Sequence, residues 1–170
     1  MAGETTIAVN DVDEFDVGAV SDANGAANTV AENAGIGTAV GLTGSASDAD
    51  ATTNTISYTL DDDAGGRFAI NSSTGQVTVN AALDYEANTS HSVTVRATSA
   101  DGSTSTQAFT INVTDVNEHT PVADDATFAV SEDAANGTVV GSVTATDADA
   151  TADLSTRWAS SSTPSDFVPI

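Results

Sequence analysis

The sequence predicts an all-β protein folded as a β-sandwich, and two observations lead to that prediction. Apolar and polar residues alternate with a period of two in several short runs, which gives each run one apolar and one polar face. Clusters of Gly, Asn, Asp and Ser separate these runs, and no convincing helical period appears. Strands of this kind bury their apolar faces by packing two sheets around one core.

About seven strands are expected in the best-defined part of the chain. The alternation is clearest in residues 56–60, where Ile, Tyr and Leu face one side, and in residues 93–97, where Val, Val and Ala do so. Turn-forming residues fill 61–66, 71–75 and 100–103. In chain order, the expected strands are 27–31, 38–47, 56–60, 68–70, 77–79, 93–97 and 109–113.

Internal repetition defines the domain organisation. Three short motifs occur twice, in the same order and about one hundred residues apart, so the repeating unit is a domain of that size. The paired segments are 6–14 with 110–118, 30–34 with 130–134, and 47–51 with 146–150. We expect residues 1–14 to be the last strand and linker of a preceding repeat, and residues 15–118 to be a complete repeat. Residues 119–150 are expected to start a following repeat, and residues 151–170 to form an irregular tail.

The charge balance excludes several classes of partner. The chain has 25 acidic and 3 basic residues, for a formal net charge of -22. Nucleic-acid binding depends on neutralising phosphates with Lys and Arg, and adsorption to anionic lipid also requires basic residues. Neither nucleic acid nor an anionic lipid surface is therefore expected as a partner. Without cysteine, the chain forms neither disulfides nor thiolate zinc sites. No segment approaches the roughly 20 apolar residues of a membrane-spanning helix.

An enzyme is not expected, and no catalytic residue or organic cofactor is assigned. The chain has two histidines and no cysteine, and it lacks both a nucleophile elbow and a phosphate-binding loop. Paired carboxylates serve glycosidases, but the acids here gather at the expected domain ends and not in an apolar cleft.

A hard-cation site is indicated where the strand 109–113 ends. Asp115, Asn117 and Glu118 place three oxygen-bearing side chains within four residues. Calcium takes six to eight oxygen ligands, so other segments must converge on this linker to complete a site. Two carboxylates 4 Å apart repel by roughly 4 kcal/mol at an effective dielectric of 20, and a bound cation reverses the sign of that interaction.

Five short motifs follow one another in the chain: Ala31-Glu32-Asn33, Asp48-Ala49-Asp50, Phe68-Ala69-Ile70 followed by Thr74-Gly75, Leu83-Asp84-Tyr85-Glu86, and Asp115-Val116-Asn117-Glu118. In this order they resemble the cadherin repeat in its bacterial form, from about residue 22 to 118 in full and from 119 to 150 in part. The resemblance implies a seven-stranded Greek-key sandwich, similar to the immunoglobulin fold and arrayed head to tail. It also implies calcium that rigidifies each junction, and an extracellular adhesive or spacer role.

The resemblance also implies a ligand set for each junction. After the complete repeat, the expected ligands come from that repeat, from the linker and from the next repeat: Glu32, Asp84, Glu86, Asp115 as a weaker candidate, Asn117, Glu118, the carbonyls of Val116 and His119, Asp147 and Asp149. The junction before the complete repeat retains Asp13, Glu14, Asp48 and Asp50. Ser99 stands where the family has a late-strand aspartate, although Asp101 lies two residues away.

The partners implied are neighbouring repeats of the same protein, with homophilic contact or a surface ligand as further possibilities. Residues 1–4 lack the basic start and apolar run of a signal peptide. We expect the chain to be a section of a longer protein that is extracellular or displayed at a cell surface. The alternative is a carbohydrate-binding module, which needs exposed aromatic faces; aromatic residues make up 5% of the chain.

Overall fold

Every regular element in the described part of the chain is a β-strand. The computed structural model describes residues 7–8, 12, 14–50 and 52–149. The chain divides into two units, Met1–Val116 (unit 1) and Asn117–Ile170 (unit 2). The all-β prediction is confirmed. No helix among the described residues is long and apolar enough to cross a membrane.

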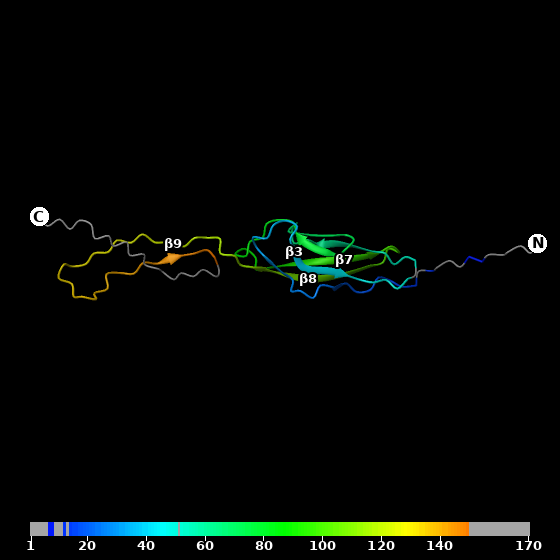
Figure 1. Cartoon of the computed structure of the whole chain (residues 1–170), viewed down its shortest axis with the longest axis horizontal. Coiled ribbons are helices and arrows are strands. Elements are labelled where there is room, and N and C mark those ends of the chain that lie inside the picture. The colour runs from blue at the N-terminus through cyan, green and yellow to red at the C-terminus, as the bar shows by residue number, and fades with distance from the viewer. Residues whose placement is uncertain (1–6, 9–11, 13, 51, 150–170) are drawn as a thin grey trace, which may run out of the picture. The chain divides into compact units, whose positions relative to one another are not determined.

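Unit 1 contains two four-stranded sheets, in the orders β1-β3-β6-β5 and β2-β8-β7-β4 (Figure 1). The longest hairpin pairs β7 with β8 in an antiparallel ladder, and β2 adds to β8 in parallel. The strands are β1 (Ser21–Asp22), β2 (Thr29–Ala31), β3 (Ala39–Ser45), β4 (Ile56–Asp62), β5 (Phe68–Ile70), β6 (Gln76–Val79), β7 (Ser90–Ser99) and β8 (Thr104–Thr114).

The first strand of the sandwich is divided between the two sheets. β1 pairs antiparallel with β3, whereas β2 pairs in parallel with β8. The chain changes sheets at residues 23–28, where the Asn24 side chain accepts a hydrogen bond from the Ala26 amide. The seven predicted strands are present, but β1 was not predicted, since its two residues, Ser and Asp, carry no apolar alternation.

The core lies between the two sheets and follows the predicted alternation. On β7, Val93, Val95 and Ala97 are fully buried, while the residues between them are partly exposed. Alternate side chains on a strand point to opposite faces, so these three face the other sheet. The buried apolar residues on strands are Val30, Val40, Leu42, Tyr58, Phe68, Val77, Val79, Val93, Val95, Ala97, Ile111 and Val113.

Unit 2 repeats the opening sequence of unit 1 without its core. Its strands β9 (Val122–Ala123) and β10 (Ala145–Thr146) pair antiparallel. Val130 and Val140 are 58% and 49% exposed, whereas the matching Val30 and Val40 of unit 1 are 6% and 0% exposed. Residues 117–149 include no counterparts of the strands β4 to β8 that cover these positions in unit 1. The four predicted domain ranges stay a prediction, and 1–6 and 150–170 lie outside the described residues.

A close approach of two backbone segments requires glycine at position 75. The Gly44 amide donates to the Gly75 carbonyl at 2.9 Å, which ties β3 to the turn before β6. Gly75 has φ +72°, and a Cβ there would lie 2.0 Å from the Gly44 carbonyl oxygen. A side chain therefore meets both an unfavourable backbone conformation and a steric clash with backbone.

Replacing Gly75 with alanine should destabilise unit 1 far more than the same change at Gly102. Gly102 also has a positive φ of +98°, but a Cβ at this position would have no atom within 4 Å. Gly102→Ala should cost only the left-handed backbone penalty of roughly 1–2 kcal/mol. Gly75→Ala adds overpacking of about 1–3 kcal/mol or more. Thermal melting of both variants measures the difference, and equal melting temperatures would contradict the close approach.

Candidate metal centres

Glu32 connects three segments at one end of unit 1. It directly follows β2 and is 4% exposed. Its Oε2 accepts the Tyr85 amide at 2.7 Å, and its Oε1 accepts the Val116 amide at 2.7 Å. A buried carboxylate is costly unless its oxygens are hydrogen-bonded, and here both are. The end of β2, the turn after Leu83 and the exit of β8 are thereby joined through one side chain.

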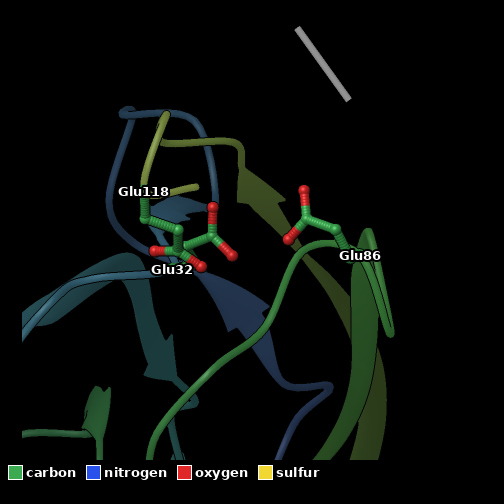
Figure 2. A group of neighbouring side chains, drawn as sticks. All are labelled: Glu32, Glu86 and Glu118. Atoms are coloured by element: carbon green, nitrogen blue, oxygen red, sulfur yellow. The ribbon is translucent and has the colours of Figure 1, made fainter. Parts of the chain in front are cut away.

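Two further carboxylates lie at this end of unit 1. A Glu86 carboxylate oxygen lies within 4.8 Å of one on Glu32 and within 4.8 Å of one on Asp115. Figure 2 shows the side chains of Glu32 and Glu86 together with Glu118, which belongs to unit 2. Glu86 is exposed and Asp115 is half-buried. We call Glu32, Glu86 and Asp115 the exit cluster, since they surround the point where the chain leaves unit 1.

Asp84, a predicted ligand, lies in the turn between Leu83 and β7. Its Oδ1 accepts the Ala87 amide at 2.9 Å, and its carbonyl accepts the Asn88 amide at 3.0 Å. These bonds close the turn that presents Glu86. Among the described residues, Asp84 is not a member of a close group of three acids. Asp84 therefore orders the turn, and its role as a ligand stays a prediction.

A second group of acids lies near the entrance to unit 1. Carboxylate oxygens of Asp48, Asp50 and Asp101 all lie within 4.8 Å of one another. We call these three the entrance cluster. Asp101 lies in the turn between β7 and β8, where the Ser103 amide donates to its Oδ1 at 2.6 Å. The Ser103 hydroxyl also accepts the Val17 amide at 2.8 Å, which fixes the incoming chain to the same hairpin.

Asp101 was absent from the predicted ligand set, and Ser99, which stands at the position of the expected aspartate, contacts the same cluster through Asp48. The Ser99 hydroxyl donates its proton to Asp48 and also lies within hydrogen-bonding distance of the Thr53 carbonyl, so this position orients an acid instead of supplying one. The turn that follows then brings Asp101 back to the group. In the sequence, the only sign that Asp101 could join the cluster was its place two residues after Ser99, where an aspartate was expected.

The Asp-x-Asp motif of unit 1 holds the incoming backbone. Asp50 is 3% exposed, and its two oxygens accept the amides of Glu14 and Phe15 at 3.1 and 3.3 Å. Asp48 in turn accepts the Asp50 amide at 3.1 Å. The hydrogen bond from Ser99, followed by that from the Asp50 amide, lowers the pKa of Asp48 below its usual value. Asp13, a predicted ligand, lies outside the described residues.

The Asp-x-Asp motif of unit 2 makes the same contacts with its own linker. Asp149 is 5% exposed and accepts the amides of Glu118 and His119 at 3.2 and 2.9 Å. Asp147 accepts the Asp149 amide at 3.1 Å. Burial acts to raise the pKa of Asp149, but the two linker amides, together with the charge of His119 and a hydrogen bond with Asp147, lower it below its usual value. The repeated sequence therefore produces a repeated hydrogen-bonding pattern.

The chemistry of both clusters of unit 1 fits a hard cation. The groups that converge are carboxylates, with neither thiolate nor imidazole in the close groups of the described residues. Oxygen-only donor sets suit calcium and magnesium, and flexible carboxylate geometry favours calcium. Asn117 and Glu118 are exposed in the described linker. The assignment of the Val116 and His119 carbonyls as ligands stays a prediction.

The fold and these clusters define a class: β-sandwich modules in tandem, with carboxylates gathered at their ends. Residues 27–114 match the family model of the cadherin domain. The chain belongs to the cadherin family. The predicted recognition and sandwich fold are thus confirmed. Cadherin domains are adhesion modules and not enzymes, in agreement with the prediction from sequence.

Relatives with matching sequence are large animal proteins. Over 150 residues, 84% of this chain, it is 41% identical to protocadherin Fat 4 of Mus musculus and spans 3% of that protein. Over 88 residues, 49% of this chain, it is 41% identical to the protocadherin-like wing polarity protein stan of Drosophila melanogaster and spans 2% of it. The bacterial form expected from the sequence stays a prediction.

Solved cadherin structures share the fold. A crystal structure of mouse cadherin-23 EC22-24 has a TM-score of 0.66 and 29% identity, covering 82% of this chain and 46% of that one. A structure of protocadherin gamma B2 extracellular cadherin domains 3-6 has a TM-score of 0.67 and 25% identity, covering 83% and 37%.

Glu32→Ala should destabilise unit 1 even in chelator, because the half-buried amides of Tyr85 and Val116 lose their charged acceptor. Hydrogen bonds to charged groups contribute roughly 1.5–3 kcal/mol each. Glu132→Ala is the matched control, since Glu132 occupies the repeated position in unit 2 and is exposed. Chemical denaturation without calcium compares the two. An unchanged midpoint for Glu32→Ala would contradict a structural role for this carboxylate.

Proposed function

We propose that this chain is a calcium-binding section of an extracellular adhesion protein, in which calcium at the ends of each repeat holds neighbouring repeats in a rigid array. The observation that supports this most strongly is the exit cluster. Glu32, Glu86 and Asp115 come from three separate segments of unit 1, and carboxylate oxygens of Glu86 lie within 4.8 Å of one on Glu32 and of one on Asp115.

The electrostatics of the exit cluster favour a bound cation. Like charges 4 Å apart repel by roughly 4 kcal/mol at an effective dielectric of 20. The amide hydrogen bonds of Glu32 stabilise its carboxylate but leave the charge in place. A divalent cation beside Glu86 would offset its repulsion with Glu32 and with Asp115. The expected dissociation constant is on the order of 10⁻⁴ to 10⁻³ M, as in other extracellular modules.

The linker and unit 2 carry the remaining proposed ligands of this site. Val116 is held by Glu32 and is followed directly in the sequence by Asn117 and Glu118, which supports including both residues in the proposed ligand set. The proposed set is completed by the second oxygen of Asp84, the carbonyls of Val116 and His119, and the carboxylates of Asp147 and Asp149.

The entrance cluster is proposed as a second, separate site. Asp48 and Asp50 were expected there from the sequence, and Asp101 supplies the third carboxylate in place of the late-strand aspartate that Ser99 replaces. Asp13 and Glu14 of the preceding linker are the further proposed ligands. Calcium at this site would join that linker to unit 1, to which Asp50 already binds it through backbone amides.

The proposed partners are the adjoining repeats of the same protein, with adhesion through homophilic contact or a surface ligand. An extracellular or cell-surface location is proposed on the family membership of the chain. One of the similar structures is described as extracellular cadherin domains. Within such a protein, one repeat acts as a spacer or as an adhesive module according to its place in the array.

Calcium should raise the melting temperature of the chain relative to chelator. A ligand that binds only the folded state stabilises it by about 0.4 to 1.4 kcal/mol per site at one to ten times its dissociation constant, the range that millimolar calcium reaches here. Thermal melting in millimolar calcium and in chelator, with calorimetric titration, measures the effect. Sodium chloride of equal ionic strength is the control for general screening. A melting temperature that responds equally to both salts would contradict specific binding.

Single substitutions should separate the two sites. Glu86→Gln should weaken calcium binding at the exit cluster, and Asp101→Asn should weaken it at the entrance cluster. Calorimetry should therefore show fewer calcium ions bound per chain for each variant. Asp62→Asn is the control, because Asp62 is an exposed acid outside both clusters. If Asp101→Asn titrates like the control while Glu86→Gln does not, the entrance site is excluded and the exit site stands.

A further inference from the structure

His91 occupies a core-facing position near the start of β7. Ser90 and Ser92 on either side are exposed, whereas His91 is half-buried and lies in register with the buried Val93 further along the strand. Its ring meets the Phe68 ring of the other sheet edge-on, with centroids 5.7 Å apart and planes at 64°. Its partner on β8 is Ile111, which is fully buried.

The surroundings of the His91 imidazole favour its neutral form. Its Nε2 is buried and has no hydrogen-bond partner among the described residues. A neutral imidazole has one N–H donor and one acceptor nitrogen, whereas the protonated ring has two donors and a full charge. Protonation would therefore place a charged ring against Phe68 and Ile111, with a buried nitrogen that has no acceptor to bind.

The charges around His91 also oppose protonation, although the chain as a whole is strongly acidic. On the β5 side, the neighbouring charged residue is Arg67, whose guanidinium acts on the imidazole. On β8, the residues flanking Ile111 are Thr110 and Asn112, which are uncharged, and the flanking residues on β7 are serines. Burial, followed by the charge of Arg67, lowers the pKa of His91 below its ordinary value of 6.5.

We propose that His91 makes unit 1 sensitive to mild acid: protonation of this core-facing imidazole weakens the packing of β7 against β5 and destabilises the sandwich. Because β7 follows the turn that carries Glu86, loosening would begin beside the exit cluster. The inference does not depend on the proposed calcium sites. It predicts that a repeat of this kind loses stability in acidic surroundings while its carboxylates are still ionised.

The sign of the effect follows from proton linkage. The unfolded chain takes up a proton on this histidine near pH 6.5, before the folded chain does. Stability is therefore fully present above that pH and declines as the pH falls from it toward the lower folded pKa. The pKa values of Asp48 and Asp61 are lowered from 3.8, so their contributions are lost only at still lower pH. The pH range in which protonation of His91 destabilises the fold therefore lies above the range in which these two carboxylates are protonated.

The test measures melting temperature in chelator from about pH 7.5 to about pH 5, the range in which histidine titrates. The original chain should lose several degrees across this range. His91→Phe, which fills the site without a titratable group, should melt at a nearly constant temperature. His119→Gln is the control, because His119 is exposed in unit 2 and is the other histidine of the chain. A parallel decline in His91→Phe and the original chain would overturn the proposal.

A direct titration keeps the proposal testable if His91→Phe does not fold. Nuclear magnetic resonance follows the imidazole protons of the original chain, with His119→Gln used to assign them. The His91 signal should titrate with a pKa below 6.5, and its midpoint should lie within the range in which the melting temperature declines. A His91 pKa at or above that value would overturn the proposal.

Discussion

The contact on which one end of the sandwich depends is the pair of hydrogen bonds from the Tyr85 and Val116 amides to the buried Glu32 carboxylate. Each bond spans a long sequence separation, and together they join the first strand, the turn before β7 and the exit of β8. A buried carboxylate with an amide on each oxygen is stable only in this arrangement, so its charge also specifies the arrangement. The position of the exit cluster follows from this contact.

The linkers are held by the same kind of bond from the side of the following module. Asp50 binds the amides of Glu14 and Phe15, and Asp149 binds those of Glu118 and His119. In each case the second aspartate of the Asp-x-Asp motif is buried and the first aspartate orders it through a backbone bond. A short sequence motif thus specifies where the backbone enters a module, and it does so with fewer contacts than the sandwich needs to fold.

Sequence patterns predicted what depends on local order and missed what depends on three-dimensional pairing. Alternation identified β4 and β7, because side-chain period directly reports the buried face. β1 has two residues, and its pairing with β3 is visible only in the fold. Motif order singled out Glu86 and Asp50 as candidate ligands, and both lie in close groups of acids. Asp101 could not be assigned, since a hairpin turn and not sequence spacing brings it to the entrance cluster.

The acids of this chain divide by environment into two groups with different physical consequences. Glu32, Asp50 and Asp149 are buried and bound to backbone amides, so they support the fold whether or not a cation is present. Glu86 is exposed and Asp101 half-buried, and each adds charge to a cluster whose other members are held in place. Amide bonds stabilise a carboxylate without neutralising it, so the repulsion remains after every amide bond is made. If calcium relieves that repulsion as proposed, its concentration controls the rigidity of the junctions, while the apolar core of unit 1 maintains the sandwich itself.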